Sequence, residues 1–211
     1  MDEDLPESCG NKPAPLAVVS KTIVVQAREM DKRNSIVAGA SRVFELSGFR
    51  GVGVDAVLAP SGTSTRTLYK HFGSREALVR AVLEDRHRQF MQQLLGNDPA
   101  DPVGDLFDQL QLWLDAHGAR GCMLLRARSE YAGSSADIVG LVRDQKGEFE
   151  REIARRVELV LGRADARLAR QVWLLFEGAT AAASVVDPRL AVGDAREAAL
   201  LLVAGAQGPD A

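Results

Sequence analysis

The spacing of apolar residues and glycines from Ile36 onward constrains the fold of this chain more than any other feature. Ile36, Ala40 and Phe44 recur every four residues and so lie on one stripe of an α-helix. Gly48 stands where that helix would end, because glycine readily adopts the left-handed conformation of a helix C-terminus. We expect a first helix that Asp31 caps and Gly48 closes.

A sharp turn joins the next two predicted helices. Val54, Val57 and Leu58 form the short apolar face of the second. Gly62 then lets the chain bend steeply, and Ser64 can cap the third. Two short helices that cross at a steep angle are typical of a helix-turn-helix.

The third predicted helix combines an apolar anchor with a polar surface. Leu68 and Phe72 are four residues apart and point back toward the core. The residues left for its outer faces are Thr65, Arg66, Thr67, Tyr69, Lys70 and His71. Such side chains suit a DNA groove. Ser74 can cap a fourth helix, whose first residue, Arg75, opposes the helix dipole unless an anion such as a DNA phosphate lies nearby.

Residues from about 32 to 80 resemble the DNA-binding domain of TetR/AcrR family transcriptional regulators. The matching residues are Ile36, Ala40, Val43, Phe44, Gly48, Phe49, Val54, Val57, Ser61, Gly62, Ser64, Thr67, Leu68, Tyr69, His71, Phe72, Ser74, Glu76 and Leu78. The pattern departs from the family at Thr63 and at Val52-Gly53, where the second helix is usually capped. It also departs at Pro60, which removes a backbone donor and predicts a short or kinked second helix.

This resemblance implies an all-α chain of about nine helices. An N-terminal three-helix helix-turn-helix DNA-binding domain would be followed by a C-terminal helical bundle for effector binding and dimerisation. The implied bounds are a disordered tail over 1–28, the DNA-binding domain over 29–90 with its motif at about 53–72, the larger domain over 91–206, and a tail over 207–211. The alternative for the first tail is an arm that reaches DNA or a partner subunit.

Apolar periodicity predicts the helices of the larger domain. The expected segments are 74–95, 103–117, 122–131, 135–161, 165–184 and a last helix from Asp194. Gly121–Glu130 and Leu174–Ala179 also resemble the C-terminal domain of many TetR/AcrR members. In that family the last two helices usually form the homodimer interface.

The resemblance also assigns DNA contacts. The implied residues are Arg33, Ser64, Thr65, Arg66, Thr67, Tyr69, Lys70, His71 and Arg75. Those at the start of the third helix are candidates for base edges, and Arg66 has the fork geometry that pairs with guanine. Tyr69, Lys70, His71 and Arg75 are candidates for phosphate. The alternative for Tyr69 and His71 is packing between helices.

A cavity for a small apolar effector is expected in the larger domain. The candidate lining residues are Phe107, Trp113, Cys122, Met123, Phe149, Trp173 and Phe176. Plain core packing is the alternative for each. Arg126, Arg128 and Glu130 either hold a polar effector group or face solvent. Cys122 is either an inert buried thiol or a redox sensor.

The distribution of charged residues supports a DNA-binding N-terminal part and a different role for the C-terminal part. Residues 32–80 carry eight Lys or Arg against three acids, whereas residues 91–211 carry thirteen basic and eighteen acidic side chains. The three histidines form no ligand-spaced cluster, so we expect no metal and no other cofactor. No catalytic motif is visible, which argues against an enzyme. Two cysteines and the lack of a leader-like or membrane-length apolar segment predict a cytoplasmic protein.

The function predicted from these features is that of a DNA-binding repressor that binds a palindromic operator of double-stranded DNA as a homodimer and responds to a small effector. One alternative is a regulator controlled by oxidation of Cys122 or by no ligand. The other is a helical dimeric binding protein with impaired DNA contact, for which Pro60 is the warning.

Overall fold

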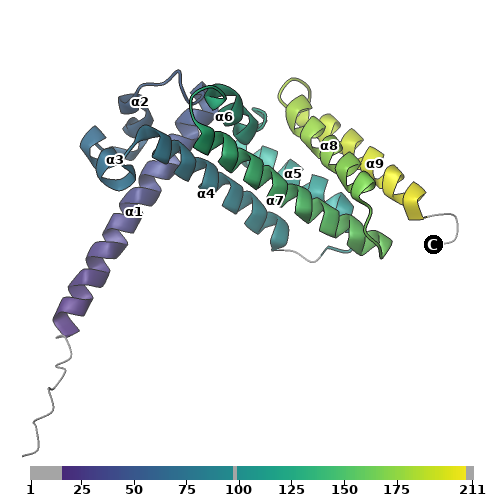
Figure 1. Cartoon of the computed structure of the whole chain (residues 1–211), viewed down its shortest axis with the longest axis horizontal. Coiled ribbons are helices and arrows are strands. Elements are labelled where there is room, and N and C mark those ends of the chain that lie inside the picture. The colour runs from purple at the N-terminus through teal and green to yellow at the C-terminus, as the bar shows by residue number, and fades with distance from the viewer. Residues whose placement is uncertain (1–15, 97–98, 208–211) are drawn as a thin grey trace, which may run out of the picture.

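The computed structural model describes residues 16–96 and 99–207, with side chains from Arg28 onward, and within these ranges all regular structure is helical. The predicted all-α class is therefore confirmed. The α-helices are α1 (Leu16–Ser47), α2 (Val54–Leu58), α3 (Thr65–Phe72), α4 (Arg75–Leu95), α5 (Pro102–His117), α6 (Met123–Tyr131), α7 (Ala136–Leu161), α8 (Ala166–Ala182) and α9 (Pro188–Gln207), as labelled in Figure 1. A short 3-10 turn, η1 (Ala59–Ser61), follows α2.

Side-chain caps define where most of these helices begin. The residues that accept a backbone N–H of the first turn are Ser64, Ser74, Asp101, Ser135 and Asp165. Each satisfies a donor that has no partner inside its helix. At its other end α7 closes at Gly162, whose φ of 67° is left-handed.

Two helix starts differ from the sequence prediction. Helix α1 begins at Leu16, so Asp31 lies inside it and residues 16–28 are helical rather than a disordered tail; positions 1–15 lie outside the described residues. Extending a formed helix adds one hydrogen bond per residue, whereas nucleating one is costly. Helix α9 begins at Pro188 rather than Asp194, because proline suits the first helical position.

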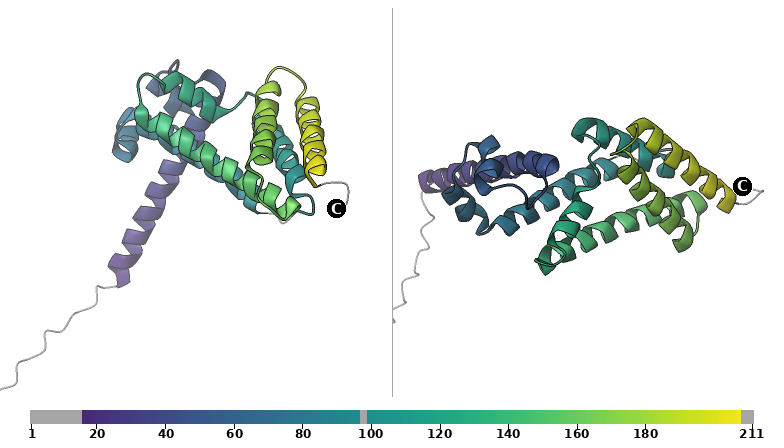
Figure 2. Two further views of the ribbon diagram at one scale, coloured as in Figure 1. Left: turned by 45° about the vertical axis from the view of Figure 1, so that its right-hand side comes forward. Right: turned by 90° about the horizontal axis from the view of Figure 1, so that it is seen from above.

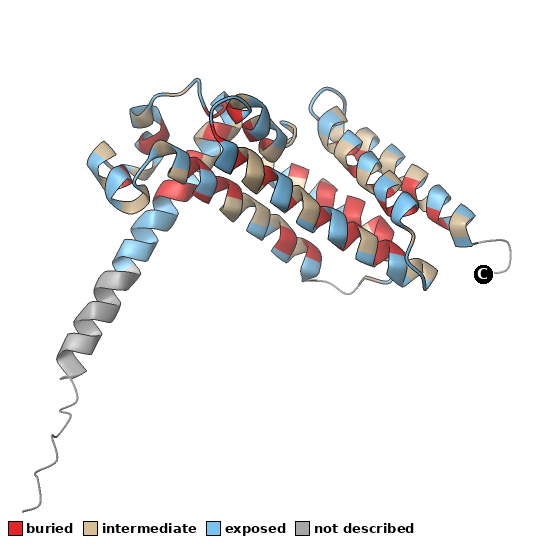
Figure 3. Ribbon diagram, viewed as in Figure 1, coloured by how far each residue is buried: buried red, intermediate tan, exposed pale blue. Residues whose placement is uncertain are grey.

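The described part of the chain has two hydrophobic cores, and their division differs from the predicted domain boundary at residue 90. The first core combines α1 to α4 with α6 and the start of α7, from Ile36 to Val142. The second combines the ends of α4 and α7 with α5, α8 and α9. Figure 3 shows the buried residues of α4 and α7 running through both regions. Helix α6 thus packs with the DNA-binding unit although it belongs to the larger domain in sequence.

Pro60 is accommodated by a close approach to α1. Helix α2 has five residues and passes directly into η1, which contains Pro60. A Cβ added at Gly39 would lie 3.3 Å from Pro60 Cβ and 3.3 Å from the Ser61 amide nitrogen. The segment of α2 and η1 is therefore packed against Gly39 of α1. Helix α3 follows this segment in the chain.

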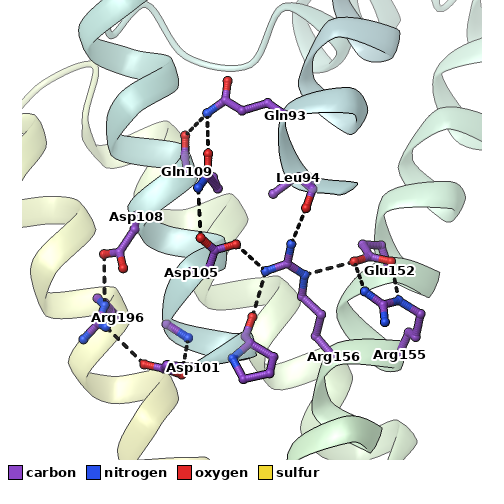
Figure 4. A network of polar contacts seen from close by, with 12 residues as sticks. Gln93, Leu94, Asp101, Asp105, Asp108, Gln109, Glu152, Arg155, Arg156 and Arg196 are labelled. Atoms are coloured by element: carbon purple, nitrogen blue, oxygen red, sulfur yellow. Dashed lines mark hydrogen bonds and ion pairs between the residues drawn. The ribbon is translucent and has the colours of Figure 1, made fainter. Parts of the chain in front are cut away.

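A buried guanidinium joins α4, α5 and α7 (Figure 4). Arg156 of α7 is 1% exposed. Its Nη2 donates to the Leu94 carbonyl at 2.7 Å, and its Nη1 donates to the Pro102 carbonyl at 2.9 Å and to Asp105 Oδ2 at 2.7 Å. Its Nε donates to Glu152 Oε1 at 2.9 Å. The end of α4 and the start of α5 are thereby tied to one side chain.

The countercharge for this guanidinium stays ionised. Burial alone would raise the pKa of Glu152, but hydrogen bonds from Arg155 and Arg156 outweigh burial and lower that pKa below its ordinary value. The buried charges therefore compensate one another, as buried ions must.

We expect Arg156→Met to lower the free energy of unfolding by about 3–5 kcal/mol, because removing one partner leaves buried carboxylates and carbonyls unpaired. Urea denaturation of the full chain measures this. Arg143→Met on the same helix is the matched control, since Arg143 is exposed and pairs with Asp144 across 3.4 Å. Equal denaturation midpoints for the two variants would contradict the assignment.

Candidate nucleic-acid interface and small-molecule cavity

Helix α3 is presented as the sequence predicted, with an apolar underside and a polar outer surface. Leu68 is fully buried and Phe72 is half-buried against the first core. Gly62, with φ of 59°, makes the turn before it. The Ser64 hydroxyl accepts from the Thr67 amide at 3.3 Å, which fixes the start of α3. The outer side chains are thus displayed on a short, capped helix.

The nine predicted DNA-contact residues have different surroundings. The exposed ones are Arg33, Ser64, Arg66, Tyr69 and Lys70, and the half-buried ones are Thr65, Thr67, His71 and Arg75. Arg66 and Tyr69 make no hydrogen bond or ion pair with any side chain that the structure describes. Thr65 donates to Asp55 Oδ1 at 3.1 Å, and the Arg33 guanidinium lies 5.1 Å from the centre of the Phe72 ring.

Lys70 is paired with α1. Its Nζ lies 2.7 Å from Glu29 Oε1, and both side chains are more than half exposed. The hydrogen bond and charge of Lys70 lower the pKa of Glu29. An exposed pair of this kind is weak. Lys70 can therefore exchange Glu29 for another anion at little cost.

Arg75 is placed differently from the prediction that it contacts phosphate. Its Nη2 donates to the carbonyls of Phe49 and Val52, each at 2.6 Å, and its guanidinium lies 5.7 Å from the Phe44 ring centre. Backbone carbonyls thus supply the negative partial charge that the sequence prediction assigned to DNA. Arg75 holds the loop between α1 and α2 against the start of α4.

Helix α6 holds the end of α1. Glu130 Oε2 accepts from the amides of Phe49 and Arg50, each at 2.8 Å, and Arg126 Nη1 donates to the Glu45 carbonyl at 2.9 Å. Arg126 and Glu130 were expected either to hold a polar effector group or to face solvent, and in the structure they instead bind backbone groups at the end of α1. Their charges instead satisfy backbone groups left open where α1 ends.

A cavity of about 90 Å³ lies between α4, α5, α7 and α8, beside the start of α6. Of the seven predicted lining residues, those that line it are Trp113, Cys122, Met123, Phe149 and Phe176. Phe107 is fully buried in the second core instead. Trp173 packs against the same core, away from the cavity, and its Nε1 has no hydrogen-bond partner among the described residues.

Sequence reasoning missed the polar lining of this cavity. These residues are Arg86, His87, Gln145, Lys146, Glu177 and Thr180. The one available signal was Glu177, a single charge within the otherwise apolar stretch 172–183, whereas Lys146 lies among other charged residues. In the structure Lys146 Nζ lies 2.5 Å from Glu177 Oε1, and both side chains are largely buried. Burial alone would lower the pKa of Lys146, but the Cys122 thiol and the Glu177 carboxylate outweigh burial and raise it.

Arg86 connects the cavity wall with α1. Its guanidinium lies 4.8 Å from the Trp113 ring centre, and its Nη2 lies 2.7 Å from Glu45 Oε1. Both members of this ion pair are largely buried. Arg86 therefore contacts the cavity residue Trp113 on one side and Glu45 of α1 on the other.

We expect Glu130→Ala to lower the free energy of unfolding by about 1.5–3 kcal/mol, because two backbone amides lose a charged acceptor. Hydrogen exchange should quicken at the amides of Phe49 and Arg50 in particular. Arg128→Ala is the matched control, since Arg128 is exposed on the same helix. Unchanged exchange at those two amides would contradict the assignment of Glu130 as their hydrogen-bond acceptor.

Residues 16–96 and 99–207 contain no group of three or more His, Cys, Asp or Glu side chains suited to hold a metal ion. None of their helices combines the length and apolarity that crossing a membrane requires.

Known proteins resemble this chain in its N-terminal part and in its fold. Residues 36–82 match the family described as bacterial regulatory proteins, tetR family. The HTH-type transcriptional regulator LmrA of Bacillus subtilis is 28% identical over 88 residues, covering 38% of this chain and 46% of that protein. The HTH-type transcriptional repressor NicS of Pseudomonas putida is 35% identical over 81 residues, covering 37% and 38%. The match thus spans less than half of either relative.

The likeness to solved structures extends further along the chain. A TetR-family transcriptional regulator from Streptomyces coelicolor has a TM-score of 0.78 with this structure, at 23% sequence identity. The superposition covers 85% of this chain and 97% of that one. At this identity the likeness concerns the fold.

Proposed function

This chain belongs to the TetR family of bacterial regulatory proteins, and from that premise we propose that it is a DNA-binding repressor that acts as a homodimer and is released by a small effector. The observation that carries the proposal is the outer face of α3. Arg66 and Tyr69 are exposed there without a partner among the described residues, on a helix anchored by the buried Leu68.

Helix α3 suits the major groove of double-stranded DNA. Arg66 would read a base edge, because a guanidinium can donate two hydrogen bonds to guanine. Tyr69 and Lys70 would contact phosphate and set the position of the helix. Two copies related by a two-fold axis would read a palindromic operator, with their α3 helices roughly 34–36 Å apart.

Helices α8 and α9 supply the proposed dimer interface. They pack side by side at the end of the molecule farthest from α3 (Figure 2). Exposed apolar side chains lie on these two helices, namely Leu174, Leu190, Leu201 and Leu202, and on the turn that joins them, namely Val185 and Val186. A second copy would bury these side chains in a four-helix contact, and apolar burial is the main driving force of association.

Helix α4 would transmit effector binding. Its end is held by Arg156 through the Leu94 carbonyl, its middle lines the cavity, and its start is buried in the first core. A ligand that pushes on the middle would therefore tilt the start of α4 and carry α3 with it. The effector acts if it binds better when the two α3 helices are wrongly spaced for DNA.

We expect Arg66→Ala to weaken binding to an operator selected from random duplex DNA by roughly 5- to 150-fold, the loss of about 1–3 kcal/mol of base discrimination. The loss should be smaller for unrelated duplexes. Arg80→Ala is the matched control, because Arg80 pairs with Glu84 on α4. If both variants behave alike across a salt titration, α3 does not read DNA and a binding protein without productive DNA contact becomes the better account.

The pair of Lys70 and Glu29 gives a second test at the same surface. Glu29→Gln should raise operator affinity a fewfold at low salt, since Lys70 becomes free to contact phosphate, and the gain should shrink as salt rises. Asp31→Asn removes the same charge from a nearby exposed position of α1, two residues farther along and on another side of the helix, and serves as the control. An equal gain in both variants would mean that only net charge matters.

We expect Leu201→Arg to convert the dimer to a monomer in sedimentation experiments, because a charge at the centre of an apolar contact must be desolvated. Leu201 is 68% exposed in the single chain, so the substitution should leave the fold intact. Leu112→Arg on α5 is a matched exposed control. A Leu201→Arg variant that remains dimeric would exclude this surface as the interface.

A further inference from the structure

Four helices each contribute one aromatic ring to the cavity. The ring centre of Phe90 on α4 lies 5.2 Å from that of Trp113 on α5 and 5.7 Å from that of Phe149 on α7, in edge-to-face geometry. The rings of Phe149 and Phe176 on α8 are 4.6 Å apart. These separations are typical of favourable aromatic pairs. The cavity wall is therefore suited to a flat apolar ring.

The charged side chains of the cavity wall are already compensated. Lys146 pairs with Glu177 across the wall, and Arg86 pairs with Glu45 behind it. His87 Nε2 lies 2.8 Å from Glu148 Oε2. A charged ligand would have to break one of these pairs or remain unpaired at a buried position, and both are costly. The wall therefore favours an uncharged ligand.

Gln145 lines the cavity and has one side-chain acceptor without a donor among the described residues. It is 6% exposed, and its Nε2 donates to the Leu83 carbonyl at 3.5 Å. Because a carbonyl can only accept, the amide nitrogen must face Leu83 and the oxygen must face the other way. That oxygen, Oε1, is buried and has no hydrogen-bond partner among the described residues. A buried acceptor without a donor is rare in folded proteins.

We infer that the effector is a small uncharged molecule with a single apolar ring and one hydrogen-bond donor, such as a hydroxyl group, which it gives to Gln145 Oε1. This inference rests on the proposed effector role of the cavity. Ring, charge and donor each follow from a different feature of the wall: the four aromatic side chains, the compensated ion pairs and the unpaired oxygen.

The size of the cavity makes this ligand act on α4. At about 90 Å³ the cavity is smaller than the roughly 150 Å³ apolar cavity known to admit benzene. A single ring therefore has to widen it, and a larger ring system would have to widen it much more. Phe90 and Arg86 lie on the α4 side of that space, so widening displaces the helix that enters the DNA-binding unit.

Calorimetry on the full chain with phenol and toluene as probes tests the donor. Both are single rings of similar size, and only phenol donates a hydrogen bond. Gln145→Met keeps the length of the side chain and removes the acceptor. The ratio of the toluene to the phenol dissociation constant should fall roughly three- to tenfold in this variant, the factor expected of one hydrogen bond.

Thr180→Val is the matched control. Thr180 also lines the cavity, but its hydroxyl already donates to the Phe176 carbonyl at 2.9 Å, so the ratio should not change. Urea denaturation of both variants checks that they fold. An unchanged ratio in Gln145→Met overturns the inference. This is the result expected if a bound water, rather than the ligand, donates to Gln145 Oε1.

Benzoate and benzylammonium test the charge requirement without any variant. Each should bind the unsubstituted chain at least roughly tenfold more weakly than phenol. The reason is that every charged side chain of the cavity wall is already paired and none is available to the ion. Tighter binding of either ion than of phenol overturns the inference.

Parallel titrations with operator DNA keep the two proposals apart. A chain that binds DNA but none of the four probes overturns the inference and leaves the DNA-binding function standing. Phenol that binds through Gln145 without releasing DNA supports the inferred ligand class and overturns the effector response.

Discussion

The buried guanidinium of Arg156 holds the C-terminal end of α4, the helix that contributes to both hydrophobic cores. Because α4 is built into two hydrophobic cores, each core limits how the other can move. Arg156 holds the Leu94 carbonyl and the start of α5 together, so this end of α4 acts as a fixed point. The cavity lies farther along the same helix, and the DNA-binding unit lies beyond it. In the effector response that we propose, a small displacement at the cavity would therefore be larger at α3.

Cations near the proposed DNA surface have three different roles, which their similar sequence positions conceal. Arg75 is bound to backbone carbonyls and stabilises the loop after α1. Lys70 is paired weakly with Glu29 and can exchange that partner. Arg66 is exposed and has no partner among the described residues, and for this reason we propose it as the residue that reads a base. The difference lies in which groups a neighbouring helix places within reach of each side chain.

How much could be predicted depended on how local the cause was. The caps at Ser64 and Ser74 and the anchor at Leu68 were predicted, because caps and apolar stripes act within a few residues. The start of α9 at Pro188 was missed because Asp194, with Glu197 three residues later, resembles a capping box and so predicted a helix start at that point. Five of the seven expected cavity residues line the cavity, since helical spacing identifies the inward face of a helix. Periodicity does not identify which other helix that face meets, and this is why Trp173 was misplaced.

The amino-acid sequence by itself determined that the chain is helical, where most of its helices begin, and that α3 presents a polar outer surface on an apolar base. Only the tertiary structure decided that α6 packs with the DNA-binding unit, that Arg126 and Glu130 hold the end of α1, and that Gln145, which lines the cavity, has a buried oxygen without a partner among the described residues. The physical reason is range. Propensity, capping and periodicity are properties of neighbouring residues, whereas the partner of a buried charge or amide comes from a helix tens of residues away.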